Sequence, residues 1–298
     1  MRPRVPPAIA LLVLALLGTA CVTPRSGSGD RDDDVGDDDD SAGDDDDSAG
    51  DDDDSTGDDD DSTGDDDDST GDDDDATGAD PCSSGGSGGS TGTSTGSAGG
   101  ASYTIHAPTS APSPAPVLFT QHGQGGTGGQ MVDLWATDAD AGGFIVVGQD
   151  SQGEGWNFNG DVSGLDAILT AVSAQHDVDL CRVYLHGYSA GAHQAYVVGL
   201  ANANIFAGLA VNAGAMSYAV DLGVWPGSVP RPIGVRIDHG TQDTVVSYGF
   251  AEQAADWLSG AGHPVELVPA VGAGHGYDPS LQPAVWSTLS GWSLSAPP

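Results

Sequence analysis

The chain of 298 residues carries 45 Asp and Glu residues against 7 Arg and no Lys, and its formal net charge is −38. A chain this acidic repels phosphate groups, which excludes most nucleic-acid binding. The charge is unevenly spread, because 29 of the acidic residues lie between residues 30 and 80. From residue 101 onward, 16 acidic residues stand against three arginines, a balance of −13. These roughly 200 residues are only mildly acidic and suffice for one domain with a hydrophobic core.

The first 20 residues have the pattern of an export signal. Arg2 and Arg4 precede the apolar run 8–17, and small residues follow as far as Ala20. A secretory signal typically has a basic start, an apolar core of about ten residues and small residues at its cleavage site. A membrane-spanning helix needs about 20 apolar residues. We therefore expect an exported protein.

The small residues before Cys21 resemble a bacterial lipobox, in which the cysteine is lipidated and becomes the new N-terminus. Gly18 stands where a lipobox most often has leucine. Val22, rather than aspartate, follows the cysteine, and this resembles lipoproteins of the outer membrane. We expect a cell-surface lipoprotein that meets the membrane only through this anchor. Ordinary cleavage near Ala20, with Cys21 an incidental thiol, is the alternative and gives an extracellular protein.

A seven-residue repeat fills residues 37–78, with four aspartates followed by Ser-Ala-Gly, Ser-Thr-Gly or Ala-Thr-Gly, six times over. The repeat has no apolar residue larger than alanine, so it cannot bury enough surface to offset its chain entropy. It predicts a disordered, self-repelling tether, continued by a Gly/Ser/Thr-rich stretch to residue 100. Calcium binding is the alternative, although the repeat lacks the ligand spacing of a calcium loop. The predicted organisation is signal 1–20, tether 21–100 and folded catalytic domain 101–298.

Beyond residue 102, short apolar runs alternate with helical patterns. The predicted strands are 117–120, 144–147, 183–185, 206–211, 233–237 and 265–268. One predicted helix carries an apolar stripe at three- and four-residue spacing, formed by Val162, Leu165, Ile168, Leu169 and Val172. Another spans 250–258, with Gly260 or Gly262 as its stop. Regular alternation predicts an α/β fold with a mostly parallel sheet covered by helices on both faces.

Ser189 is the candidate nucleophile, because Gly187-Tyr188-Ser189-Ala190-Gly191 fits the G-x-S-x-G pattern. The same pattern surrounds Ser87, Ser90 and Ser94 in the low-complexity stretch. Only Ser189 follows a predicted strand and precedes a plausible helix, 190–200, as a nucleophile elbow requires. Such a turn presents the serine oxygen at a helix N-terminus, where backbone N–H groups favour a developing oxyanion.

A serine hydroxyl needs a base and an orienting carboxylate, and both follow in the chain. His275 lies in a glycine-rich loop after the last predicted strand, and Asp243 follows the strand before it. The order serine, aspartate, histidine, each after a strand, is the α/β-hydrolase order. Asp238 and Asp278 are the competing carboxylates. Asp238 lies at the end of its strand and is expected to point elsewhere, and Asp278 is expected in a surface loop.

An oxyanion site needs a second N–H donor, expected from the loop after an early strand. The loop 121–126 follows the first of the predicted strands, and it makes the N–H groups of Gln124 and Ala190 the candidate pair. Trp156, in a later glycine-rich loop, is either a loop anchor or a substrate contact. The other histidines share no ligand spacing, so we expect neither a metal nor another cofactor.

Cys82 and Cys181 remain once Cys21 is assigned to lipidation. In an exported protein, two cysteines are candidates for a disulfide, which would tie the start of the domain to the turn before the elbow strand. Two free thiols are the alternative.

From about residue 115 to 279, the chain resembles the extracellular polyhydroxybutyrate depolymerase, feruloyl esterase and acetylxylan esterase group of the α/β-hydrolase superfamily. The matching segments are 116–123, 177–191 with its Val-Asp-x-x-Arg-Val-Tyr run, the acid loop 239–246 and Gly274-His275-Gly276. The resemblance implies Ser189, Asp243 and His275 as a triad and Gln124 and Ala190 as oxyanion donors. It implies a serine esterase acting on a polymer-derived or bulky ester.

The sequence departs from this group of esterases at two places, and two other functions remain as alternatives. Gly276-Tyr277 follows His275 where the group often has tryptophan or threonine, and the stretch 212–232 is too short for a large cap domain. An open site is expected. A serine peptidase is one alternative, and a surface binding protein that kept the fold without catalysis is the other. The acyl and alcohol parts of the substrate do not follow from the triad.

Overall fold

The structure is a computed structural model that describes residues 80–153 and 155–294. The predicted signal, Cys21 and the Asp repeat lie outside the described residues. The strands of one sheet are β1 (Gly92–Ala98), β2 (Ala101–Ala107), β3 (Ala115–Gln121), β4 (Ile145–Gln149), β5 (Val178–Tyr188), β6 (Gly208–Asn212), β7 (Gly234–Gly240) and β8 (Val265–Ala270). The helices are α1 (Gly128–Gly142), α2 (Phe158–Gln175), α3 (Ala190–Ala201), α4 (Ser217–Asp221), α5 (Gly249–Gly260) and α6 (Gln282–Leu289).

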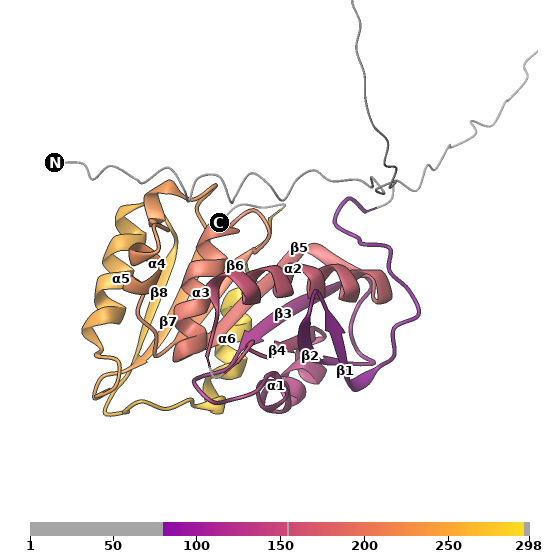
Figure 1. The fold of residues 1–298 in the computed structure, drawn as a ribbon, viewed down its shortest axis with the longest axis horizontal. Coiled ribbons are helices and arrows are strands. Elements are labelled where there is room, and N and C mark those ends of the chain that lie inside the picture. Colours follow the sequence, from indigo (N-terminus) through magenta and orange to yellow (C-terminus); the bar gives the residue numbers. More distant parts are fainter. Residues whose placement is uncertain (1–79, 154, 295–298) are drawn as a thin grey trace, which may run out of the picture. The chain divides into compact units, whose positions relative to one another are not determined.

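The sheet is mostly parallel. Its strand order is β1-β2-β4-β3-β5-β6-β7-β8, and Figure 1 shows β1 and β8 at opposite ends. The strands from β4 to β8 in that order pair in parallel, and β2 pairs antiparallel with both β1 and β4. The carboxyl ends of β3, β5, β7 and β8 therefore share one edge of the sheet, where ligands of such sheets usually bind.

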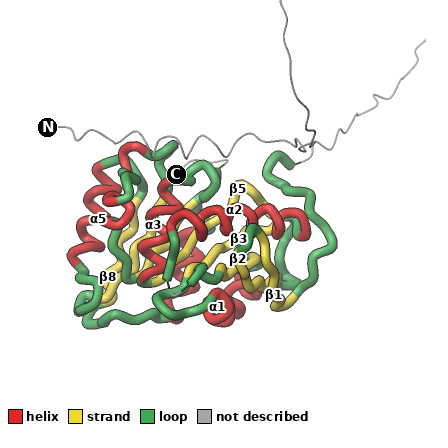
Figure 2. The backbone as a smooth tube through the Cα atoms, in the orientation of Figure 1, coloured by secondary structure: helices red, strands yellow, loops and turns green. Residues whose placement is uncertain are grey.

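Helices cover both faces of the sheet, as the alternating pattern predicts (Figure 2). On one face α2, α3 and α5 pack over the strands, and the larger buried cluster lies between these layers. The predicted α2 stripe faces this cluster, since Leu165, Ile168 and Val172 are buried. On the other face, α1 and α6 pack over the sheet and bury Trp135, Phe144 and Val285.

Local sequence explains where two of the helices begin or end. Thr127 caps α1 through a reciprocal pair of hydrogen bonds with Gln130, and Gly143 ends this helix in the left-handed region with a φ of 66°. After α5, Gly262 has a φ of 87°, which a residue with a side chain rarely adopts. The connection from β6 to β7 holds only the short α4 and a 3-10 turn, η2 (Pro226–Ser228), so no large cap covers the sheet edge here.

The predicted linker up to residue 100 is wrong for the described residues from Asp80 onward. Residues 92–98 form β1 and pair along their whole length with β2. Ser83 bridges to Asp179, and Leu180 N–H donates to Cys82 O at 2.7 Å. The folded domain therefore includes the Gly/Ser/Thr-rich stretch, whose polar residues suit an edge strand with one face in solvent. No helix follows the three additional G-x-S-x-G copies there.

No helix among residues 80–153 and 155–294 is long and apolar enough to span a bilayer.

Candidate active site at the carboxyl edge of the sheet

Ser189 lies in the sharp turn between β5 and α3. Its φ is 53° and its ψ is −115°, and Ala213 is the only other non-glycine residue in the described chain with a positive φ. Such a conformation costs on the order of 1–3 kcal/mol and persists where surrounding contacts hold it. Ser189 N–H donates to Asn212 O at 2.9 Å, and Ser189 O accepts from the N–H groups of Ala192 and His193. The turn therefore holds the serine at the N-terminus of α3.

The two glycines of the elbow are required by close backbone contacts. A Cβ on Gly187 would lie 2.3 Å from Gly191 O, and a Cβ on Gly191 would lie 2.3 Å from Gln121 O and 2.6 Å from His122 O. Backbone atoms cannot move aside as the end of a flexible side chain can. The start of α3 therefore rests directly on the loop after β3.

Three side chains from separate loops form a hydrogen-bonded chain. Ser189 Oγ lies 2.8 Å from His275 Nε2, and His275 Nδ1 lies 2.7 Å from Asp243 Oδ2. Ser189 follows β5, Asp243 follows β7 and His275 follows β8, as the sequence predicts. The His275 side chain is 15% exposed and that of Asp243 is fully buried. The serine end of the chain is therefore open to a reactant, and the carboxylate end is closed to water.

The Asp243 carboxylate is held as an anion by hydrogen bonds from three N–H groups. Oδ1 accepts from the backbone N–H groups of Val245 and Val246, each at 2.8 Å. Oδ2 faces His275 Nδ1 at 2.7 Å and His239 Nε2 at 3.3 Å. Burial by itself raises the pKa of Asp243, but the hydrogen bonds from His275, Val246 and Val245 outweigh it and lower this pKa below its usual value. Asp243 is therefore a stable carboxylate at neutral pH.

The competing carboxylates lie elsewhere. Both oxygens of buried Asp238 pair with Arg236 at 2.9 Å. Asp278 accepts from Ser280 N–H at 3.0 Å and caps the 3-10 turn η3 (Pro279–Leu281). Neither hydrogen bond leads to His275, and this separation agrees with their predicted exclusion.

The loop after β3 lies against the elbow and is held rigidly by His122. His122 Nδ1 donates to Gly123 O at 2.8 Å, and its Nε2 accepts from Ser151 N–H at 3.2 Å, so the ring is in its Nδ1–H form. A Cβ on Gly123 would lie 3.4 Å from Ser189 Cβ. Gln124 comes next in the loop. Ala190, the other predicted oxyanion donor, is the first residue of α3.

A cleft of about 530 Å³ opens beside this loop. Its walls come from the loop after β3, from α1 and from the residues next to Ser189 and His275. They are lined by His122, Gly123, Gln124, Gly126, Gln130, Met131, Asp133, Leu134, Tyr188 and Tyr277. The Tyr188 ring lies 5.7 Å from the His275 ring, centroid to centroid. The cleft therefore shares Tyr188 with the surroundings of the hydrogen-bonded serine and histidine, and its walls are mostly apolar.

Comparisons with known proteins concern the fold of the chain and one partial sequence match. No sequence profile of a known family matches the chain. Over 160 residues it is 30% identical to the bifunctional acetylxylan esterase/xylanase XynS20E of Neocallimastix patriciarum, and the match covers 51% of this chain and 23% of that protein. The chain thus spans under a quarter of that relative.

Solved structures superpose on most of the chain. An acetyl xylan esterase from Aspergillus awamori has a TM-score of 0.56 at 16% identity, covering 66% of this chain and 98% of that one. A protein assigned as a dipeptidyl aminopeptidase IV from Bacteroides ovatus has a TM-score of 0.56 at 14% identity, covering 68% of this chain and 36% of that one. The chain has the α/β-hydrolase fold. The expected fold is confirmed, including the minimal cap.

Trp156 anchors two loops of this α/β-hydrolase domain to each other. Its indole Nε1–H donates to His122 O at 2.9 Å, and its ring lies 4.8 Å from the His122 ring, centroid to centroid. These contacts match the loop-anchor interpretation. Contact with substrate stays a prediction.

Two further histidines lie near the site of the α/β-hydrolase domain. His186 is buried on β5 within hydrogen-bond reach of Thr120 Oγ1 at 3.0 Å, and burial lowers its pKa to about 3. His193, one turn along α3 from Ser189, stacks on Tyr218 with ring centroids 4.4 Å apart. Burial, followed by repulsion from His275 and His239, lowers the pKa of His193 to about 4. His186 and His193 are therefore neutral at pH 7.

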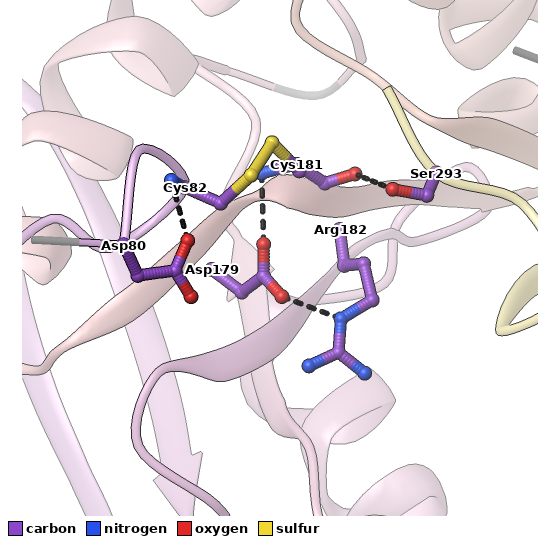
Figure 3. Close-up of a disulfide and its surroundings, with 6 residues drawn as sticks. All are labelled: Asp80, Cys82, Asp179, Cys181, Arg182 and Ser293. Carbon is purple, nitrogen blue, oxygen red and sulfur yellow. Dashed lines mark hydrogen bonds and ion pairs between the residues drawn. A yellow bond between two sulfur atoms is a disulfide. The ribbon is translucent and has the colours of Figure 1, made fainter. Parts of the chain in front are cut away.

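Cys82 and Cys181 form a disulfide in the structure, with their Cα atoms 5.3 Å apart (Figure 3). Cys181 lies near the start of β5, and Asp179 beside it pairs with Arg182. Among the described residues, Cys82, Asp179 and Cys181 are the group of ligand atoms close enough to hold a metal. Because both sulfurs are bonded to each other, these residues do not make a metal site.

Proposed function

We propose that the protein is a serine carboxylic-ester hydrolase. The observation that carries the proposal is the chain of hydrogen bonds from Ser189 Oγ through His275 to Asp243, at 2.8 and 2.7 Å. The esterase names of the sequence relative and of the Aspergillus awamori structure support it.

In the proposed reaction Ser189 Oγ attacks the ester carbonyl carbon while its proton passes to His275 Nε2. Asp243 holds the resulting imidazolium through Nδ1, and the backbone N–H groups of Ala190 and Gln124 stabilise the tetrahedral oxyanion. His275 then gives its proton to the leaving alcohol, and an acyl-enzyme remains on Ser189. Water, deprotonated by the same histidine, attacks this ester and releases the acid.

The proposed substrate is a polymer-derived or bulky ester, like those named for the acetylxylan esterase, feruloyl esterase and polyhydroxybutyrate depolymerase group. The short β6–β7 connection and the apolar cleft beside Tyr188 support an accessible site. Release of acetate, ferulate or hydroxybutyrate from the corresponding polymers is the measurement that separates these substrates.

Peptide hydrolysis is the second candidate, favoured by the structural likeness to the assigned dipeptidyl aminopeptidase. The discriminating experiment compares a chromogenic short-chain ester with a peptide anilide, using wild type and Ser189→Ala. We expect ester turnover that falls by about 10⁶-fold in the variant. Turnover of the anilide alone favours the peptidase, and unchanged turnover in Ser189→Ala contradicts the catalytic role of Ser189. A fluorophosphonate that fails to label folded wild type favours a non-catalytic binding protein.

We further propose export and lipid anchoring through Cys21, which rest on the sequence pattern of residues 1–21. Metabolic labelling with a fatty acid should mark wild type and leave Cys21→Ala unmarked. Labelling of both contradicts anchoring at Cys21.

A further inference from the structure

His239 is a buried histidine whose Nε2 lies 3.3 Å from Asp243 Oδ2, the same oxygen that faces His275. It is the next-to-last residue of β7, and its side chain is fully buried. Its ring packs edge-on against Tyr248, with centroids 6.0 Å apart and an interplanar angle of 82°. The proposed reaction gives this imidazole no role.

The hydrogen bonds of His239 fix which ring nitrogen carries the proton. Nε2 lies 2.7 Å from Val246 O, and a carbonyl oxygen can only accept, so Nε2 carries a hydrogen. The same nitrogen lies 3.3 Å from Asp243 Oδ2. The N–H group therefore donates to the backbone of the acid loop, and the same nitrogen lies close to the carboxylate that this loop presents.

The other ring nitrogen has no hydrogen-bond partner among the described residues. His239 Nδ1 is buried, and burying a polar atom without a hydrogen-bond partner destabilises the fold. A leucine or phenylalanine at this position would fill a similar space without that cost. The imidazole therefore contributes an interaction that an apolar side chain cannot make. Its hydrogen bond to Val246 O and its proximity to Asp243 are the described polar contacts that could supply this interaction.

We propose that His239 is a positioning residue for the Asp243–His275 pair. Its Nε2–H donates to Val246 O and so fixes the backbone at Val246, whose N–H group, like that of Val245, donates to Asp243 Oδ1. The same Nε2 lies 3.3 Å from Oδ2. The carboxylate can then rotate little, and Oδ2 stays aimed at His275 Nδ1. Oδ2 makes its hydrogen bond with His275 at 2.7 Å, and its contact with His239 is longer, at 3.3 Å. This inference rests on the proposed function.

The test compares His239→Leu, which removes the N–H group, with His239→Gln, whose amide N–H reaches a position like that of Nε2. The matched control is His263→Leu. His263 is also buried, but its described hydrogen bonds go to backbone atoms of Ile233 and Pro226 and not to the site. We expect kcat for a chromogenic ester to fall by about 10- to 100-fold in His239→Leu with little change in KM. His239→Gln should recover most of this loss, and His263→Leu should lose stability but keep kcat per folded molecule.

An unchanged kcat in folded His239→Leu, or an equal loss in His239→Gln, overturns the inference. If His239→Leu does not fold, ¹⁵N NMR of the histidine rings in wild type still decides, because we infer a protonated Nε2 and a bare Nδ1 at neutral pH. The opposite tautomer overturns the inference. Failure of the proposed function is distinguishable, since it appears as unchanged ester turnover in Ser189→Ala.

Discussion

A Cβ atom on Gly191 would lie 2.3 Å from the carbonyl oxygen of Gln121, so the helix after the elbow and the strand end beside it touch through their backbones. Gly191→Ala must separate them, and the shift moves Ser189 relative to His275. We expect a destabilisation of about 1–3 kcal/mol and a loss of ester turnover per folded molecule.

Gly260→Ala is the matched control for Gly191→Ala. Gly260 is the last residue of α5, and a Cβ there meets nothing within 4 Å. Alanine in a helix should leave the stability unchanged or raise it by up to about 1 kcal/mol. Chemical denaturation and ester turnover of both variants check this contrast, and wild-type behaviour of Gly191→Ala contradicts it.

The two aspartates near the end of β7 should have separable effects. Asp243→Asn keeps the shape of the carboxylate but cannot stabilise the imidazolium, so we expect kcat to fall by about 10⁴-fold. Asp238→Asn breaks the buried pair with Arg236, which should cost about 3–5 kcal/mol of stability and leave kcat of the folded fraction near wild type. Turnover normalised by circular dichroism distinguishes the two losses. A greater loss of kcat in Asp238→Asn would reverse the assignment of the acid.

The disulfide closes a sequence separation of 99 residues, from Cys82 to Cys181. Cross-linking a loop of this length lowers the entropy of the unfolded chain, which stabilises the folded state by about 4.7 kcal/mol. Removing a native disulfide typically lowers the free energy of unfolding by about 2–5 kcal/mol. We expect Cys82→Ser/Cys181→Ser to lose stability in that range. The kcat of this variant should stay near wild type, because Cys181 lies near the start of β5 and Ser189 directly follows its end. An extended strand separates the two residues by about 25 Å. Denaturation with and without reductant checks this expectation, and a wild-type protein indifferent to reductant contradicts it.

Acid should destabilise the domain through His186. An unfolded histidine has a pKa of about 6.5, whereas burial lowers that of His186 to about 3. Between these values the unfolded state binds more protons, so stability falls as the pH falls, by at most about 1.4 kcal/mol per pH unit from this residue. Unfolding free energies between pH 7 and pH 4 should therefore fall less steeply for His186→Gln than for wild type. Equal slopes would contradict the assignment of a neutral, buried imidazole.

The sequence predicts the central strands and the order of the triad, because those strands are continuous apolar runs and each candidate residue directly follows one. The edge of the sheet is harder to predict. β1, with the sequence GTSTGSA, has no large apolar side chain and forms through pairing with β2 and packing of the Tyr103 ring on Gly96. β2 was detectable from the alternation of Ala101, Tyr103, Ile105 and Ala107, all of which are buried.

Helix α1 escapes prediction because of its glycine-rich ends, although Met131, Val132, Trp135 and Ala139 carry the right spacing. In the site, sequence position puts His239 near the acid, yet its contact with Asp243 depends on how the loop 241–246 folds back. That fold-back is set by backbone hydrogen bonds, which no residue pattern displays. The same holds for His239 Nδ1, which is buried without a hydrogen-bond partner, because the burial of a single atom depends on how the side chains pack.

The close contacts of glycine backbones extend beyond the elbow. A Cβ on Gly240, in the acid loop, would lie 2.4 Å from Gly274 O, next to His275, and Gly128 and Gly148 approach each other as closely. Main-chain atoms thus fix the acid loop to the histidine loop, and the elbow to the end of β3, without the side chains that line the cleft. For protein engineering, a library that varies Met131, Leu134, Tyr188 and Tyr277 and keeps these glycines constant can explore new ester specificities on an unaltered reaction centre.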